Sequence, residues 1–142
     1  MREALRLARA GADAGEVPVG AVVAIADEIV GRGCNAPVAR ADPTGHAEIL
    51  ALREAAARIG NYRLEEATLY CTLEPCVMCA GALVAARVTR LVFGARDLRF
   101  GGVRSKFQVA DSDVLNHRVQ VVEGVLAVEC VTLLREFFGE RR

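Results

Sequence analysis

Apolar and polar positions along the chain predict alternating helices and strands. Residues 1–15 carry small and apolar side chains at helical spacing, so we expect an amphipathic helix there. Short runs rich in Val, Ile and Thr between turn residues predict strands, and Ala- and Leu-rich stretches predict further helices. The expected strands cover residues 17–25, 28–31, 68–73, 91–94 and 119–125. The expected helices cover residues 1–15, 46–59, 75–87 and 127–138, and residues 34–45 are expected to form a loop.

Strands that alternate with helices predict an α/β fold with helices on both faces of a sheet. The first two strands are joined by a turn at Ala26-Asp27 and are expected to pair back on each other. The connections from the third strand to the fourth, and from the fourth to the fifth, are long enough for parallel crossovers. We therefore expect a three-layer α/β/α sandwich around a mixed five-stranded sheet, with the ligand site beyond the carboxyl ends of the strands. Glu74-Pro75 and Arg96-Asp97 fall at those ends.

Composition narrows the class of protein. The chain has 142 residues, of which 53% are hydrophobic and 25% charged, and this balance predicts one globular domain over residues 1–142. No secretory signal opens the sequence, and no stretch approaches the roughly 18 apolar residues that span a bilayer. Five cysteines are an odd number for a disulfide framework. We therefore expect a cytoplasmic protein that is not bound to a membrane and uses some of its thiols to hold a metal.

The formal net charge is zero, so composition gives no support to nucleic-acid binding. The basic residues are nevertheless concentrated between residues 87 and 118, where seven of them stand against three acidic ones. Such a segment could meet a phosphate backbone, or it could be an ordinary solvated surface. Charge alone leaves both interpretations open.

Two short motifs carry the candidate chemistry, His46-Ala47-Glu48 and Pro75-Cys76-Val77-Met78-Cys79. Each opens a predicted helix, and Pro75 suits the first helical position, where its missing N–H costs nothing. Cys76 and Cys79 would then share one face of the first turn, where the helix macrodipole stabilises thiolates. With His46, they would offer two sulfurs and one nitrogen, a set that suits zinc.

The number of ligands distinguishes a catalytic zinc site from a structural one. Structural sites are closed by four protein ligands, whereas three leave a position for water. Glu48 lies two residues from His46 and could take a proton from that water. A Cys-x-x-Cys motif alone can be redox-active or structural, and His-x-Glu alone says little. Their combination in this order, with Pro before the first Cys, is specific for a catalytic zinc site.

Other candidate residues have simpler interpretations. His117 is expected at the surface or in a turn, although it could become a fourth ligand that closes the metal site. Phe137 and Phe138 have apolar neighbours at helical spacing and are expected in the core. Small buried hydrophobic roles are expected for the remaining thiols, Cys34, Cys71 and Cys130.

Taken together, these motifs resemble the cytidine/deoxycytidylate deaminase superfamily. More closely, the chain resembles the bacterial tRNA-specific adenosine deaminases. The resemblance extends over nearly the whole chain and depends on residues 16–22, Asn35, and residues 42–49, 61–64, 72–82, 92–97 and 116–119. Residues 98–109 fit the family pattern only loosely.

The resemblance implies a cytidine deaminase-like fold and a hydrolase that converts the wobble adenosine of a tRNA anticodon to inosine and releases ammonia. One Zn²⁺ per chain would be held by His46, Cys76 and Cys79. Hydroxide would attack C6 of adenine while Glu48 protonates N1 and then the leaving amine. The implied partners are the tRNA anticodon arm and a second copy of the chain in a homodimer. Independently, residues 77–86 are apolar nearly all round, which fits burial against a partner helix or wholly within the monomer.

The resemblance also implies substrate contacts. Asn35 would read the base edge, since its amide both donates and accepts, although an Asn here could instead cap a loop. Ala47 would offer its backbone N–H to the base, and Leu73 would line the pocket. Asp97 would lie near the ribose 2′-hydroxyl of the preceding nucleotide, a contact that distinguishes RNA from DNA. Phe138 would lie beside the anticodon nucleotides, as an alternative to core packing.

Two other functions remain open from the sequence. The same chemistry could act on a free nucleoside, nucleotide or base of the cytidine or guanine type. Alternatively, the metal could stabilise a binding module that has no catalytic activity. Activity on an anticodon stem-loop separates the first two possibilities, and a Glu48 variant tests the third.

Overall fold

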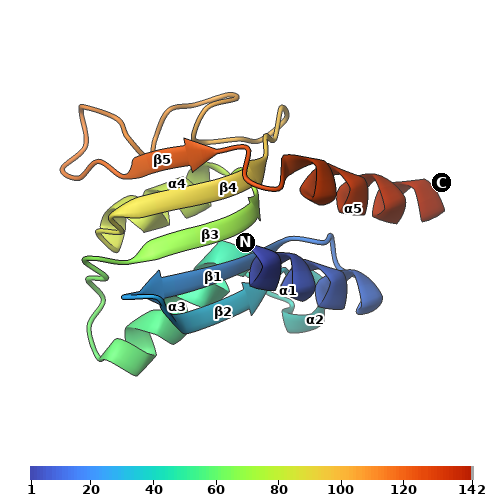
Figure 1. Cartoon of the computed structure of the whole chain (residues 1–142), viewed down its shortest axis with the longest axis horizontal. Helices are drawn as coiled ribbons and strands as arrows, with labels where there is room; N and C mark the ends of the chain where they lie inside the picture. The colour runs from blue at the N-terminus through green and yellow to red at the C-terminus, as the bar shows by residue number, and fades with distance from the viewer. Residues whose placement is uncertain (142) are drawn as a thin grey trace.

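The computed structural model describes residues 1–141 and contains five helices and five strands (Figure 1). The helices are α1 (Arg2–Asp13), α2 (Pro37–Arg40), α3 (Ala47–Ile59), α4 (Val77–Ala85) and α5 (Ala127–Glu140). The strands are β1 (Gly20–Ile25), β2 (Glu28–Cys34), β3 (Thr68–Leu73), β4 (Arg90–Ala95) and β5 (Gln120–Glu123). Among residues 1–141, no helix is both long enough and apolar enough to cross a membrane.

The strands form one mixed sheet in the order β2-β1-β3-β4-β5. β1 is antiparallel to both of its neighbours, β2 and β3, whereas β4 is parallel to both β3 and β5. Helices α1 and α5 lie on the near face of the sheet, and α3 and α4 lie on the far face (Figure 1). This arrangement confirms the predicted three-layer sandwich and both parallel crossovers, and it has the cytidine deaminase-like topology that the resemblance implied.

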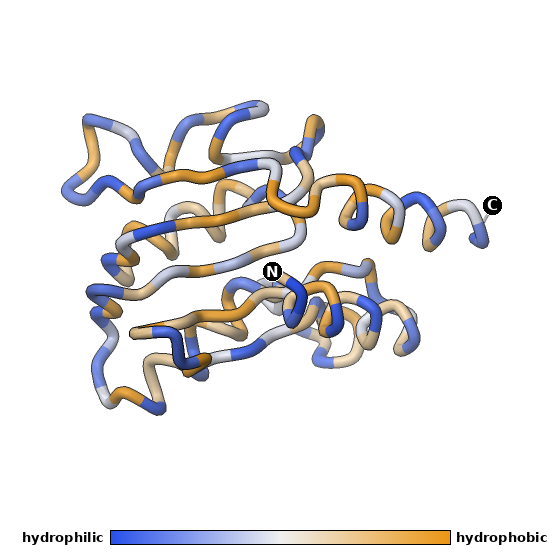
Figure 2. Tube along the Cα trace, viewed as in Figure 1, coloured by the Kyte–Doolittle hydropathy of each residue, from blue (hydrophilic) through white to orange (hydrophobic). Residues whose placement is uncertain are grey.

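The core between the layers is aliphatic. It is built mainly from Ala, Val and Leu, with one fully buried aromatic ring, that of Phe93. The middle strand β4 follows a mostly apolar run, which Figure 2 shows in orange, whereas β3 is paler because its sequence TLYCTL places Thr and Tyr between apolar residues. Strands covered on both faces need such runs, because neither side of the sheet meets water.

Two glycines of β2 set the distance between the sheet and α3. A Cβ atom on Gly31 would collide with the carbonyl oxygen of Ala51, and one on Gly33 would collide with that of Ala47. Glycine at both positions lets the helix backbone lie directly against the strand. This close approach fixes the start of α3, where His46 and Glu48 are found.

The structure corrects several predicted boundaries. Strand β2 continues to Cys34, and α2 forms one short turn inside the predicted loop 34–45. The prediction that Pro75 is the first helical residue is wrong, because α4 begins at Val77 and Cys76 is its N-cap. His46 is likewise the N-cap of α3. Both capping residues have extended backbones, so each side chain lies just before a helix rather than within it.

Candidate active site

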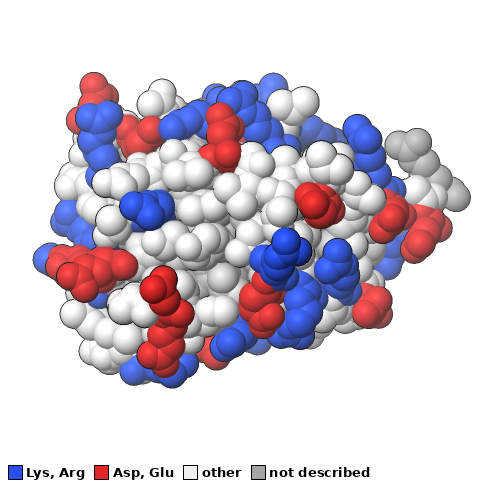
Figure 3. Space-filling model, viewed as in Figure 1, with Lys and Arg blue, Asp and Glu red and all other residues white. Residues whose placement is uncertain are grey.

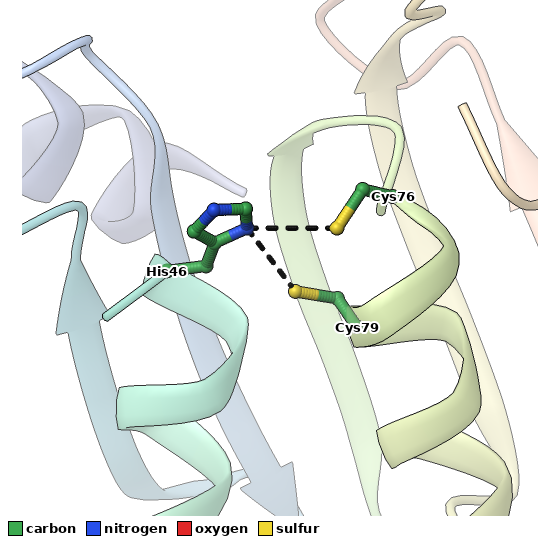
Figure 4. A group of neighbouring side chains, drawn as sticks. All are labelled: His46, Cys76 and Cys79. Carbon is green, nitrogen blue, oxygen red and sulfur yellow. Dashed lines mark hydrogen bonds between the residues drawn. The ribbon is translucent and has the colours of Figure 1, made fainter. Parts of the chain in front are cut away.

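Three candidate metal ligands meet where the N-termini of α3 and α4 face each other (Figure 4). The Nδ1 atom of His46 lies 3.5 Å from the Sγ atom of Cys76 and 3.5 Å from that of Cys79. All three ligand atoms lie within 4.8 Å of one another. His46 and Cys76 approach from the two N-cap positions, and Cys79 from the first turn of α4.

These distances fit a single tetrahedral ion. Zn–S and Zn–N bonds of about 2.3 and 2.0–2.1 Å at tetrahedral angles place sulfur and nitrogen about 3.6 Å apart. The nitrogen–sulfur distances of 3.5 Å match this value. Within residues 1–141, no fourth His, Cys, Asp or Glu joins the group. The donor set therefore suits a borderline-soft metal ion that keeps one position for a non-protein ligand.

One of the two thiols, that of Cys76, already favours the thiolate form that binds a cation. Hydrogen bonds from Cys79 and then His46 lower the pKa of Cys76 to about 4, even though burial opposes the shift. The proton shared with Cys76, together with burial, raises the pKa of Cys79. The interaction with Cys76 also raises the pKa of His46. A cation between the three groups would stabilise both thiolates and leave the imidazole neutral.

Glu48 is a buried carboxyl group beside this cluster. It lies in the first turn of α3, is only 4% exposed, and lines the same cavity as His46 and Cys76. Burial raises the pKa of Glu48, because the charged form loses its hydration. A carboxyl group whose pKa is raised in this way is suited to act as a general acid and base.

The cavity beside the cluster has a volume of about 750 Å³. Its wall combines the two motifs with residues from the carboxyl ends of β3 and β4 and from α5. Of the predicted substrate-binding residues, four lie in this wall, namely Asn35, Leu73, Asp97 and Phe138. Ala47 and Cys79 are fully buried behind it. The sequence-predicted residues are thus gathered at one place.

Asn35 and Ala47 are connected directly. The backbone N–H of Ala47 donates to Oδ1 of Asn35, with an N–O distance of 3.2 Å. The same bond joins the strand that ends at Cys34 to the start of α3. The amide plane of Asn35 is therefore held at the cavity wall, and the Ala47 donor has an intramolecular partner.

Asp97 is presented by a tight turn. Its Oδ1 atom accepts the backbone N–H groups of Arg99 at 3.0 Å and Phe100 at 3.1 Å. Its own N–H donates to Oε2 of Glu74 at 3.0 Å. These bonds restrict both the backbone and the side chain of Asp97 at the rim of the cavity.

The two phenylalanines near the end of α5 have different surroundings. Phe137 is 8% exposed and packs in the interior, as predicted, whereas Phe138 is 48% exposed and lines the cavity. Their rings pack edge to face with centroids 5.3 Å apart. The Phe138 ring is therefore exposed to a ligand in the cavity, while the buried Phe137 ring supports it from behind.

Several cavity residues were not predicted from the sequence, among them Val17, Val19, Leu98, Arg99, Phe100 and Leu134. Arg96 and Arg99 also line an adjoining hollow of about 710 Å³, together with Arg135 and Arg141. The basic stretch between residues 87 and 118 could have indicated the first two. Its charge is partly neutralised, since Arg96 pairs with Glu123, and Figure 3 shows acidic groups interspersed among basic ones along the upper edge.

The remaining histidine and cysteines lie away from the metal group. His117 Nε2 lies 2.7 Å from the carbonyl oxygen of Val88, so it is not a fourth ligand. Cys71 and Cys130 are buried, as predicted, whereas Cys34 is only half-buried. All five cysteines are free thiols.

A His/Cys/Cys group at two helix N-termini, next to a buried glutamate on an α/β/α sheet, defines the zinc-type deaminase class. Comparisons with known proteins agree. The model of the MafB19-like deaminase family matches residues 1–142. A tRNA-specific adenosine deaminase of Haemophilus influenzae is 52% identical over 143 residues, which cover 100% of this chain and 83% of the relative. The Bacillus subtilis enzyme of the same name is 44% identical over 142 residues, which cover 100% of this chain and 88% of the Bacillus protein.

Solved structures give the same relationship. A tRNA:A34 deaminase, studied for A-to-I editing at the wobble position, has a TM-score of 0.91 and 38% identity, covering 94% of this chain and 97% of its own. A guanine deaminase from Nitrosomonas europaea has a TM-score of 0.84 and 28% identity, covering 97% of this chain and 82% of its own. The chain belongs to the MafB19-like deaminase family and to the family of tRNA-specific adenosine deaminases.

Proposed function

We propose that this chain converts the wobble adenosine of a tRNA anticodon to inosine, with one Zn²⁺ per chain. The observation that carries the proposal is the buried Glu48 carboxyl beside the His/Cys/Cys group, in a cavity of about 750 Å³. A cavity of this size can enclose a nucleoside. The tRNA-specific relatives, 44–52% identical over the whole chain, support adenosine in tRNA as the substrate.

His46, Cys76 and Cys79 would hold the zinc ion, which lowers the pKa of water towards about 7 and so makes hydroxide available. Glu48 takes the proton of the nucleophilic water and delivers it to N1 of adenine as C6 is attacked. It then carries a second proton to the exocyclic amine, which leaves as ammonia. The balance is adenosine plus water giving inosine plus ammonia.

The residues of the cavity wall would bind the nucleotide. Asn35 presents its amide to the base edge. When the substrate enters, the backbone N–H of Ala47 donates its hydrogen bond to the base instead of to Asn35. Leu73 supplies the apolar wall, Asp97 accepts from the ribose hydroxyl of the preceding nucleotide, and Phe138 packs on a neighbouring base. The arginine-lined hollow beside the cavity supports an RNA backbone as the larger ligand.

The assembly and cellular setting are part of the same proposal. Residues 1–142 form one deaminase domain, of which Arg142 lies outside the described residues. Val77 and Ala85 form an exposed apolar edge of α4, which supports a homodimer through this helix. The cysteines are free thiols, and a metal site built on thiols requires that they stay reduced. This supports a location in the reducing cytoplasm, where tRNA is also found.

The decisive experiment is ammonia release from an anticodon stem-loop with adenosine at the wobble position. We expect turnover of this RNA and little or none of adenosine, cytidine or guanine. Guanine is included because the guanine deaminase shares the fold and 28% of the sequence. Turnover of free bases or nucleosides without turnover of the stem-loop would overturn the tRNA assignment.

Asp97→Asn should reduce the preference for RNA over DNA. Asn retains an Oδ1 atom for the N–H groups of Arg99 and Phe100, so the turn is preserved while the negative charge is lost. A hydrogen bond to a charged group contributes about 1.5–3 kcal/mol, or roughly ten- to a hundredfold. We expect the ratio of kcat/KM for an RNA stem-loop to that for one with a deoxyribose before the target to fall by this factor. An unchanged ratio would remove the role of Asp97.

A further inference from the structure

We propose that Glu74 is a positioning residue, whose carboxylate holds the 97–105 segment in register with the metal-bearing start of α4. Glu74 directly follows β3, lies two residues before Cys76, and is only 2% exposed. Burying a carboxylate is costly unless its oxygens are fully hydrogen-bonded. Its surroundings therefore indicate what the residue does.

The Glu74 carboxylate binds both ends of one segment. Its Oε2 atom accepts the backbone N–H of Asp97 at 3.0 Å and the hydroxyl of Ser105. Its Oε1 atom accepts backbone N–H groups from residues further along the segment, namely Val103 at 3.2 Å, Arg104 at 2.6 Å and Ser105 at 2.8 Å. Five donors thus converge on two oxygens, and Asp97 is tied to the same anchor as Ser105.

Glycines allow the segment to approach Glu74 and the start of α4. A Cβ atom on Gly101 would collide with the Glu74 carboxyl group, and one on Gly102 would meet the backbone of Cys76 and Val77. Gly101 also forms a bridge with Cys76, and the N–H of Gly102 donates to the carbonyl oxygen of Pro75 at 2.8 Å. The segment is therefore docked on the residues that precede and include a metal ligand.

The residues between Asp97 and Gly101 have little support besides the Asp97 turn. Leu98 and Phe100 line the cavity but are 72% and 62% exposed, so burial does not hold them in place. Glu74 ties the Asp97 end of the segment to the start of α4, and the contacts of Gly101 and Gly102 with Cys76 and Pro75 hold its middle. Glu74 therefore helps to set the position of the Asp97 carboxylate relative to the metal group. This inference rests on the proposed function, since it gives Glu74 the task of keeping the ribose contact aligned with the reacting base.

Glu74→Gln tests the role with a minimal change of shape. A glutamine oxygen at the Oε1 position can still accept the three backbone N–H groups, but its NH₂ group then faces the N–H of Asp97 and the Ser105 hydroxyl. We expect faster amide hydrogen exchange at residues 97–101, with the central strands unchanged. For the stem-loop, KM should rise about tenfold or more while kcat changes little, because a charge-assisted hydrogen bond is lost. Zinc content should stay near that of the parent.

Two further variants sharpen the test. Ser105→Ala removes only the hydroxyl donor and should give a smaller effect in the same direction. Glu54→Gln weakens another carboxylate acceptor, which binds the N–H of Arg32 at 2.6 Å on the edge strand β2, away from the 97–105 segment. It should leave both KM and exchange at residues 97–101 unchanged.

Three results in Glu74→Gln would overturn the proposal. Unchanged exchange at residues 97–101 would show that the carboxylate does not hold the segment. An equal increase throughout the sheet would reduce its role to general stability. Zinc loss in proportion to lost turnover would make it a support of the metal site instead. If the parent itself fails to deaminate the stem-loop, the proposed function fails, while the exchange measurement still decides whether Glu74 positions the segment.

Discussion

Glu48→Gln is expected to reduce deamination of the stem-loop by about 10²–10⁴-fold or more, the usual contribution of a general acid and base. The amide has nearly the same shape as the carboxyl group but cannot carry a proton from water to the base. Glu48 lies outside the His/Cys/Cys group, so one zinc ion per chain should remain bound. The measurements are single-turnover rates of ammonia release and metal content in the same samples.

The matched control is Glu54→Gln, which makes the same change at an exposed position of the same helix. It should leave both turnover and zinc content unchanged. If Glu48→Gln retains parental turnover, the proton-transfer role is wrong, and a zinc-stabilised binding module becomes the better description. If zinc leaves together with activity, Glu48 supports the metal rather than the chemistry.

The sheet could be predicted from the sequence because its strands are unambiguous. β3 and β4 are short runs bounded by turn residues, and the connections that follow them, through α4 and through the irregular stretch before β5, are long enough for parallel crossovers. The helix boundaries were harder to predict from the sequence. Four-residue α2 is too short to show a helical period, and the N-cap roles of His46 and Cys76 depend on backbone angles that no side-chain pattern encodes.

The metal group was predictable for a different reason. Its three donors lie in two motifs that each open a helix, so local spacing was enough to identify them. The cavity wall depends instead on how distant segments dock. The 97–105 segment is held by backbone N–H groups on Glu74, and backbone groups leave no sequence pattern. Asp97 and Phe138 were therefore found through the family resemblance, whereas Leu98 and Phe100 were missed.

Cys76→Ser is expected to lose zinc and, with it, much of the thermal stability of the loaded protein. The hydroxyl is a poor zinc ligand but an effective N-cap, so α4 should still begin at Val77. A ligand at a thousand times its Kd stabilises the folded state by about 4 kcal/mol. At about 2–4 °C per kcal/mol for a chain near this size, removing it lowers Tm by roughly 10 °C.

Chelation separates the metal effect from the substitution itself. Because serine preserves the cap, parent and Cys76→Ser should melt at similar temperatures in excess chelator and differ only when zinc is supplied. Cys34→Ser, which changes a half-buried thiol outside the metal group, should retain both zinc and the zinc-dependent rise in Tm. Equal metal content and equal Tm in zinc-loaded parent and Cys76→Ser would contradict the ligand assignment. In that case the 3.5 Å approach of Cys76 to His46 would be a hydrogen bond of the folded chain and not half of a metal site.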